Sequence, residues 1–282
     1  MSPAREENLI LCNATLVGGS LEITPEQLET IVNAAAQAGF GGVSLWAFHH
    51  IAAVSAGASP DQVKAWHTDR GLAVPVVESL LGWDGGDKAA IDEQCLPVLE
   101  VAELYGAKMV AGVVMAPELE SAGAAADGLG YLCKLATDRG LDVCIEWLPW
   151  SGLPDIKSVW KLIQDVGSEN LGIVFDTWHW LRQPGGPDLE TLRKIPGSRI
   201  HCVQLDDATL EAGGDEIMVE TMSKRLLPGD GDVDWSSVLG TLDEIGADPI
   251  WAPEVFNAEL MALGPDEMAR RIGESTRKVL GL

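Results

Sequence analysis

Short apolar runs alternate with amphipathic stretches along the whole chain. Most of the apolar runs are continuous rather than alternating between polar and apolar positions, which is typical of strands covered on both faces. A stretch with helical spacing or a helix-start signal follows each run. The eight expected strands are residues 9–16, 42–48, 72–80, 108–115, 141–148, 171–178, 199–205 and 249–256.

Capping signals mark the first expected helices. The segment 24–27 (TPEQ) is a capping box with proline at the first helical position, and 59–62 (SPDQ) starts a second helix. Pro97 lies inside the helical stretch 87–105, where it predicts a kink or a division into two helices. The remaining expected helices are residues 123–139, 155–166, 187–195, 235–245 and 265–280.

Eight strand–helix units in 282 residues predict a (β/α)₈ TIM barrel that fills residues 1–282 as one domain. A doubly wound open sheet is the alternative architecture. Such a sheet usually carries a glycine-rich dinucleotide fingerprint after its first strand, and the segment 17–20 (VGGS) does not fit one.

The charge of the chain narrows the possible partners. It has 43 acidic and 19 basic residues, a formal net charge of -24, so phosphate backbones and anionic membranes repel it. The five cysteines form no C-x-x-C pair, and neither a secretory signal nor an apolar run of membrane-spanning length occurs. We expect a cytoplasmic protein with a small-molecule substrate, no nucleic-acid or membrane partner, and possible self-association into a homo-oligomer.

Polar residues end many of the apolar runs. In a barrel of this kind the chemistry is found at the carboxyl ends of the strands. The candidates at these positions are His49, His50, Glu78, Glu146, Asp176, His179, His201, Gln204, Asp206, Asp207 and Glu254.

Three of these candidates, Glu146, Asp176 and Glu254, lie inside or at the edge of apolar runs, so each is expected to be partly buried. Burying three neighbouring carboxylates without a positive charge is costly. Arg182 and Arg225 are the main cationic side chains available, and a divalent cation is the simpler answer. Oxygen ligands favour Mn²⁺, Mg²⁺ or Co²⁺, and Zn²⁺ is also possible.

Two residues compete for the ligand position on the seventh strand. His201 is the better ligand type, whereas Gln204 lies nearer the carboxyl end of the strand. Because the two are three residues apart, a strand points them to opposite faces. Residue type favours His201 and position favours Gln204.

Several motifs in the same order resemble the xylose isomerase-like TIM barrels, also called the sugar phosphate isomerase/epimerase family. The likeness covers nearly the whole chain. Its parts are GFGGVSLW (39–46), LYGAKMV (104–110), DVCIEW (142–147), FDTWH (175–179), VQLDD (203–207), LLPGDGDVDW (226–235) and PEVF (253–256).

The resemblance implies one divalent metal ion, most often Mn²⁺, held by side chains from strands five to eight. Glu146, Asp176 and Glu254 take three of the family's ligand positions. Gln204 stands where the family usually has histidine, a replacement that some dehydratases share. By the same resemblance, His179 and Arg225 match positions that contact substrate.

The family's chemistry implies an isomerase or epimerase that moves a proton next to the carbonyl of a sugar or related polyhydroxy compound, through a metal-stabilised enediolate. Glu146 and Glu254 are then the catalytic carboxylates, with His179 beside them. A dehydratase of the inosose or dehydroshikimate type is the first alternative, with His179 or His50 protonating the leaving hydroxyl. A non-catalytic barrel that binds a ligand is the second. An abasic-site endonuclease, a related barrel, is disfavoured by the net charge of -24.

Tryptophan is unusually frequent, with ten against four phenylalanines and two tyrosines. Six of the ten fall at or just after expected strand ends, where flat rings would wall the mouth of the barrel and stack on a sugar or cyclitol ring. These six are Trp46, Trp83, Trp147, Trp150, Trp178 and Trp180. The expected substrate contacts are Trp46, Trp147, Trp178, His50, Glu78, His201 and Arg225.

Overall fold

Eight parallel strands lie in one sheet in chain order, β1 to β8, in the computed structural model, which describes residues 6–214 and 216–282. A parallel bridge between Leu9 and Trp251 brings the last strand back to the first, so the sheet is a nearly closed barrel. The predicted (β/α)₈ architecture is confirmed. The strands are β1 Ile10–Cys12, β2 Gly42–Trp46, β3 Ala73–Leu80, β4 Met109–Gly112, β5 Asp142–Ile145, β6 Leu171–Asp176, β7 Ile200–Gln204 and β8 Ile250–Trp251.

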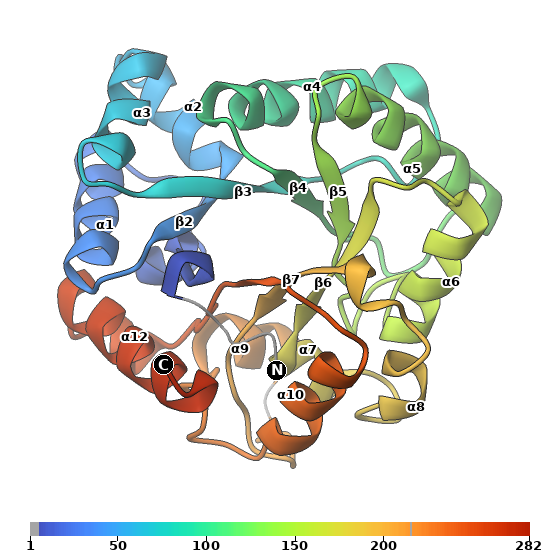
Figure 1. Cartoon of the computed structure of the whole chain (residues 1–282). Coiled ribbons are helices and arrows are strands. Elements are labelled where there is room, and N and C mark those ends of the chain that lie inside the picture. The colour runs from blue at the N-terminus through green and yellow to red at the C-terminus, as the bar shows by residue number, and fades with distance from the viewer. Residues whose placement is uncertain (1–5, 215) are drawn as a thin grey trace.

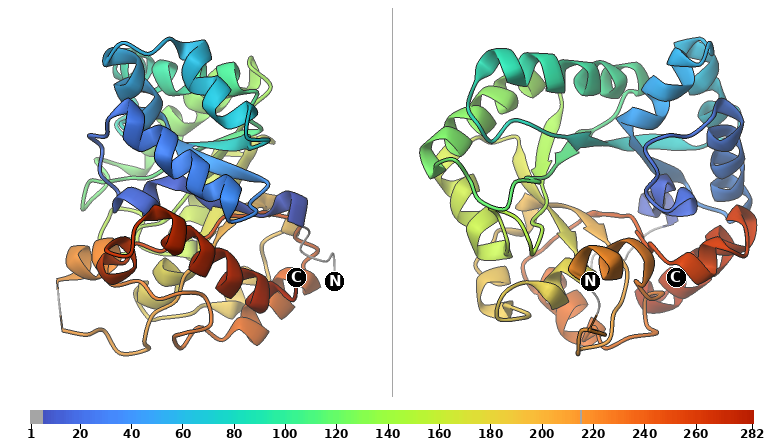
Figure 2. Two further views of the ribbon diagram at one scale, coloured as in Figure 1. Left: turned by 90° about the vertical axis from the view of Figure 1, so that its left-hand side faces the viewer. Right: turned by 180° about the vertical axis from the view of Figure 1, so that it is seen from behind.

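Helices surround the barrel in Figure 1, and those of the expected strand–helix units form most of the outer layer. Helices α1 and α12 come from opposite ends of the chain and lie side by side, which closes the ring (Figure 2). These outer helices are α1 Pro25–Gln37, α3 Pro60–Thr68, α4 Lys88–Tyr105, α5 Ala122–Thr137, α6 Ile156–Val166, α8 Leu189–Leu192, α10 Trp235–Glu244 and α12 Pro265–Leu280.

The predicted helix starts are confirmed where capping residues were identified. The Thr24 hydroxyl accepts a hydrogen bond from the Gln27 backbone N–H, and the Gln27 side chain accepts one from Thr24 N, which is the predicted capping box. The Ser59 hydroxyl likewise accepts a hydrogen bond from the Gln62 backbone N–H and caps α3, without the reciprocal bond. Pro97 lies within α4 but does not divide it, since one helix runs from Lys88 to Tyr105.

Several predicted strands end earlier than the apolar runs that define them. The chain leaves β1 for a 3₁₀ helix, η2 Asn13–Val17, and helices α2 Ala47–Ser55 and α7 Thr177–Arg182 begin directly after β2 and β6. An apolar run does not distinguish a strand from a buried helical turn, which is the physical reason for these errors. Further short elements are η1 Glu6–Asn8, η3 Gly197–Arg199, α9 Ile217–Ser223 and α11 Ala258–Met261.

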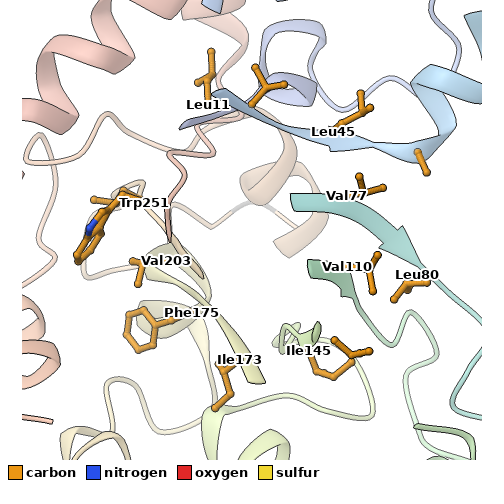
Figure 3. Packing of buried hydrophobic residues seen from close by; sticks show 14 of the residues in the cluster. Leu11, Leu45, Val77, Leu80, Val110, Ile145, Ile173, Phe175, Val203 and Trp251 are labelled. Carbon is orange, nitrogen blue, oxygen red and sulfur yellow. The ribbon is translucent and has the colours of Figure 1, made fainter. Parts of the chain in front are cut away.

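Two apolar layers follow from the alternation of side chains along the strands. Outward-facing residues such as Leu11, Phe175 and Trp251 pack against the helices (Figure 3). A smaller cluster fills the barrel, and its members include small side chains such as Ala111 and Cys144. The described helices include none that is long and apolar enough to span a membrane.

Candidate active site

A cavity of about 360 Å³ opens at the carboxyl ends of the strands. Its lining comes from strand ends far apart in sequence, as the barrel topology requires. The buried polar lining side chains are Glu78, Glu146, His179, Thr221, Arg225 and Glu254, and the half-buried Ser79 also lines the cavity. Six of the eight strand ends therefore contribute to one pocket: the polar side chains come from the ends of β3, β5, β6 and β8, and Trp46 and Gly112 add the ends of β2 and β4.

The junction of β5 and β6 pairs a carboxylate with an imidazole. His179 Nε2 lies 3.0 Å from Glu146 Oε1, and both side chains are buried. Asp176, the last residue of β6, caps α7 by accepting a hydrogen bond of 2.7 Å from the His179 backbone N–H. This cap fixes the start of α7, so it orients His179 toward Glu146.

Arg225 supplies positive charge to a buried carboxylate cluster. Its Nη1 atom lies 2.8 Å from Asp176 Oδ2, 2.6 Å from Asp206 Oδ2 and 3.2 Å from Glu254 Oε2. The opposite edge of the guanidinium donates to the backbone oxygen and the hydroxyl of Thr221, each at 2.9 Å. The side chain is therefore fixed from both sides.

A second group of contacts joins β1, β3, β7 and β8. The Cys12 thiol lies 3.1 Å from Glu254 Oε1, and Gln204 Nε2 lies 3.4 Å from Glu78 Oε2. Gln204 also stands opposite Asp176 in the register of β7 on β6. The Gln204 amide oxygen is buried and has no hydrogen-bond partner within the described part of the chain.

Burial dominates the electrostatics of the cavity. It raises the pKa of Glu78 to about 8, with the Glu254 charge adding to the rise, and that of Glu254 to about 7, although Arg225 opposes the second rise. Burial and the Asp176 charge raise the pKa of Glu146 well above its usual range. Burial also lowers the pKa of His179 to about 4, so its imidazole is neutral at neutral pH.

The same side chains form two compact groups of metal-ligating atoms. One oxygen or nitrogen from each of Glu146, Asp176 and His179 lies within 4.8 Å of the others. Cys12, Glu78 and Glu254 form a second group on the same criterion. The donors are mostly carboxylates, which suit hard divalent cations.

The structure brings most of the predicted site residues together but leaves four substrate candidates outside the cavity lining. His50 lies on α2, where its Nδ1 is 3.1 Å from the Tyr105 hydroxyl. His201 is the second residue of β7, so it lies near the amino end of the barrel, 3.4 Å from Cys144 Sγ. Gln204, the last residue of β7, is buried outside the lining as well, but it lies at the carboxyl end of the strand and contacts Glu78, which lines the cavity.

Trp147 and Trp178 are the other two substrate candidates that lie outside the cavity lining. Both are fully buried, Trp147 against Phe175 and Trp178 against Trp150 and His179. They pack behind the cavity wall rather than forming it.

The predicted tryptophan wall is therefore much smaller than expected. Trp46 and Trp150 line the cavity, whereas Trp83 and Trp180 are buried like Trp147 and Trp178. Position after a strand does not decide whether a ring faces the mouth or the helices, because that depends on the turn that follows. The tryptophan-rich segments serve mainly to pack the rim of the barrel.

Two contributors to the site, Cys12 and Thr221, were not singled out from the sequence, and Asp206 was a candidate without an assigned role. Asp206 accepts from the Thr177 hydroxyl at 2.7 Å and pairs with Arg225, and Cys12 contacts Glu254. Asp206 was visible as a polar residue after the seventh strand, and Cys12 sits at the end of the first. Thr221 lies on α9, which no capping signal marked, so its role had no sequence signal.

Comparison with known proteins gives relatives at low identity. The chain is 28% identical over 239 residues to a 3-dehydroshikimate dehydratase of Pseudomonas putida, a match that covers 83% of this chain and 36% of the dehydratase. It is 26% identical over 190 residues to an inosose isomerase of Bacillus velezensis, covering 65% of this chain and 66% of the isomerase. The chain thus spans about a third of the length of the first of these relatives.

Solved structures share the fold over almost the entire chain. The IOLI protein, crystallised with a bound zinc atom, is 19% identical with a TM-score of 0.83, covering 97% of this chain and 98% of that one. A D-allulose 3-epimerase from Methylomonas sp. is 14% identical with a TM-score of 0.73, covering 99% and 100%. A model of the xylose isomerase-like TIM barrel family matches residues 32–278, so the chain belongs to that family, as its motifs predicted.

Proposed function

We propose that this chain is a divalent-metal-dependent isomerase or epimerase, which moves a proton next to the carbonyl of a sugar or related polyhydroxy compound. The observation that carries the proposal is the presence of two buried carboxylates, Glu146 and Glu254, in the lining of one cavity. They come from β5 and β8, so a substrate carbon between them meets a carboxylate on either side. One removes the proton and the other returns it.

The donor types suit a single divalent cation between the two compact groups of ligating atoms. Glu146, Asp176, Gln204 and Glu254 would hold it, and the buried, unpartnered Gln204 oxygen supports this assignment. Arg225 alone leaves the negative charge of Glu78, Glu146, Asp176, Asp206 and Glu254 only partly compensated. When bound, the cation supplies positive charge beside the oxygen atoms on which charge develops. Mn²⁺ is the first candidate, with Mg²⁺, Co²⁺ and Zn²⁺ as alternatives.

The titration of Glu254 suits proton transfer near neutral pH. Burial places the pKa of Glu254 at about 7, close to the value at which a group both accepts and releases protons efficiently. Cys12 donates to one Glu254 oxygen and Arg225 to the other, so the carboxylate is held in one orientation.

Glu146 and His179 act as a pair that shares one proton. The pKa of Glu146 is raised and that of His179 is lowered, in each case chiefly by burial, so the proton of the pair resides on the carboxyl group. The neutral imidazole accepts it at Nε2. In this protonated state Glu146 is the group that can give a proton to the substrate, so Glu254 is the carboxylate that removes one.

A dehydratase is the second candidate, and Gln204 favours it. The resemblance already linked glutamine at this position to some dehydratases, and one relative is a 3-dehydroshikimate dehydratase. In that reaction a β-hydroxyl leaves after proton removal, and the Glu146–His179 pair is the group that would protonate the leaving hydroxyl. Loss of water from the substrate, rather than return of a proton, is the outcome that separates the two candidates.

A proton-exchange screen tests the proposal. The Mn²⁺-loaded protein is incubated in D₂O with keto sugars, inososes and 3-dehydroshikimate, and deuterium incorporation and loss of water are followed by NMR and mass spectrometry. We expect Glu146→Gln and Glu254→Gln each to slow exchange by about 10²–10⁴-fold. Glu244→Gln is the matched control, because Glu244 pairs with Arg193 at the surface. Near wild-type turnover in either cavity variant would contradict the assigned roles.

Metal analysis tests the remaining alternative, a non-catalytic barrel. The purified protein is expected to contain about one divalent ion per chain, and added Mn²⁺ is expected to raise the thermal midpoint after chelation. A protein with no bound ion and no thermal response to Mn²⁺ would instead indicate a binding role for the barrel.

A further inference from the structure

The cavity changes in character from floor to rim. Its polar residues, such as Glu78 and Glu254, are less than a tenth exposed, whereas the large apolar side chains at its rim stand in solvent. Leu21 is 54% exposed, Met115 53% and Met218 40%. We refer to Leu21, Met115 and Met218 as the apolar rim.

The apolar rim is assembled from three separate segments. Leu21 precedes α1, Met115 follows β4, and Met218 lies on α9. Leaving large apolar side chains in water gains nothing for folding, and their convergence on one opening marks a binding surface rather than scattered exposure. Methionine side chains are flexible and polarizable, which lets them adapt to a flat apolar ligand.

The walls between rim and floor are also apolar. The half-buried Trp46 and Phe48 and the buried Phe256 also line the cavity. Trp46 and Phe256 lie close together, with ring centroids 6.1 Å apart. Polar groups that could bind the hydroxyls of a ligand are therefore concentrated at the floor.

We propose that the substrate is amphipathic, with a polyhydroxylated carbonyl ring at the floor and an apolar, ring-sized substituent that lies on the apolar rim. This inference rests on the proposed function, since that function places the reacting ring at the carboxylates. A bare sugar would leave the rim in water, whereas an aryl or comparable group covers it and removes apolar surface from solvent. A keto sugar ring that bears an apolar aglycone has this chemistry, and the simple glycoside, which lacks the ring carbonyl, is a non-reacting analogue of it.

Paired glucosides test the inference. Phenyl β-glucoside and methyl β-glucoside present the same hydroxyls and differ in the apolar group, and their dissociation constants are measured calorimetrically on the Mn²⁺-loaded protein. We expect the phenyl compound to bind about tenfold more tightly. In the double variant Met115→Ser, Met218→Ser the ratio falls to about one, while the affinity for the methyl compound stays unchanged.

Leu282→Ser is the matched control. Leu282 is 42% exposed, about as much as Met218, but it lies at the carboxyl end of the chain and does not line the cavity. This variant should keep the wild-type ratio. Equal affinity for the two glucosides, or no detectable binding of the phenyl compound, overturns the inference.

Two further measurements separate the possible failures. If the apolar rim is instead covered by a second copy of the chain, the double variant changes the mass measured by light scattering and leaves the affinity ratio unaltered, which also overturns the inference. If the ratio is one but metal-dependent deuterium exchange on keto sugars persists, the inference fails and the proposed function stands. If exchange and metal binding are both absent, the proposed function fails whatever the ratio.

Discussion

Arg225 is a single buried cation that contacts three buried carboxylates. It is 2% exposed and contacts Asp176, Asp206 and Glu254, each of which is also buried. Removing one partner of a buried ion pair leaves charge without compensation, which is much more costly than losing a surface pair. The same guanidinium competes with any cation for oxygens of Asp176 and Glu254.

Replacing Arg225 with methionine therefore has two opposite effects. We expect Arg225→Met to lower the free energy of unfolding of the chelator-treated protein by about 3–5 kcal/mol, measured by urea titration. We also expect Mn²⁺ to bind more tightly, measured calorimetrically, because a competing positive charge is gone. Arg193→Met is the control, since Arg193 pairs with Glu244 in solvent and should cost at most about 1 kcal/mol. A chelated Arg225 variant as stable as wild type would show that the cluster does not depend on this cation.

Glu78 and Glu254 make the metal-free protein sensitive to alkaline pH. Their folded-state pKa values, about 8 and about 7, lie above the ordinary value of 4.5, so the folded state holds more protons than the unfolded state between these limits. The stability that these two carboxyl groups contribute is thus fully present below pH 4.5 and is lost as pH rises through 7 and 8. Histidines with lowered pKa values, such as His179 and His67, act in the opposite sense only below their ordinary value of 6.5.

The informative window therefore runs from about pH 6.5 to about pH 8.5, where the histidines contribute little. Over it we expect the thermal midpoint of the chelated protein to fall by roughly 3–6 °C. The Glu78→Gln variant has no ionisable group at this position, so its thermal midpoint should fall less. Saturating Mn²⁺ should remove the fall, because the cation favours the ionised carboxylates. An equal slope in the wild type and in Glu78→Gln would refute the assignment to Glu78.

At the scale of single residues, the sequence predicted which residues belong to the site better than it predicted which side chains they contact. Glu146, Asp176 and Glu254 stood out because each charged residue interrupts or ends an apolar run. The structure groups Glu146 with Asp176, and Arg225 joins Asp176 to Glu254. The contact of Arg225 with Asp206 depends on how a segment of almost twenty residues folds back over the barrel, and no local pattern encodes that path. The prediction of a tryptophan wall was wrong for a similar reason, since a position at a strand end does not determine the direction of the ring.

Elements between the strands and the outer helices determine how the mouth is built. Helices α2, α7 and α9 all lie at the carboxyl ends of strands, and none was expected. Helix α7 follows β6 without a linking loop, and its cap Asp176 is also the last residue of the strand, so the apolar run hides the start of the helix. Helix α9 has no side-chain cap. The regular outer helices were predictable because they combine caps with long amphipathic stretches.

The segment after β7 is organised around one buried carboxylate, Asp207. Its Oδ1 accepts from the backbone N–H groups of Ala208 and Val233, and its Oδ2 from Gly229 N and Trp235 Nε1. The backbones of Asp207 and Leu226 also form a reciprocal pair of hydrogen bonds. This arrangement positions the residue next to Leu226, which is Arg225.

Asp207→Asn tests whether this loop anchor positions Arg225. The amide group would face N–H donors, so we expect a loss of about 1–3 kcal/mol in unfolding free energy by urea titration. We also expect KM to rise more than kcat falls, because Arg225 is assigned to binding. Asp230→Asn, an exposed position in the same loop, is the control. A variant that loses stability but keeps its KM would limit Asp207 to a structural role.

On the scale of the whole molecule, the order of the elements was readable because a barrel repeats one unit eight times. Each error in a strand boundary was local and left the count of units unchanged, so the fold was robust to it. Charge is the other global property, with a formal net charge of -24. A compact chain with this charge repels itself, and that repulsion is separate from the electrostatics of the buried cavity.

Salt and metal should therefore stabilise the protein by distinguishable routes. Raising KCl from about 0.1 M to about 1 M shortens the Debye length from about 10 Å to about 3 Å, which screens the surface charges and should raise the thermal midpoint of the chelated protein. Mn²⁺ at constant ionic strength should add about 4 kcal/mol when present at a thousand times its dissociation constant. The double variant Glu146→Gln, Asp176→Asn should lose the Mn²⁺ response and keep the KCl response, both followed by calorimetry. A variant that still gains full stability from Mn²⁺ would place the cation outside the cavity, among the surface carboxylates.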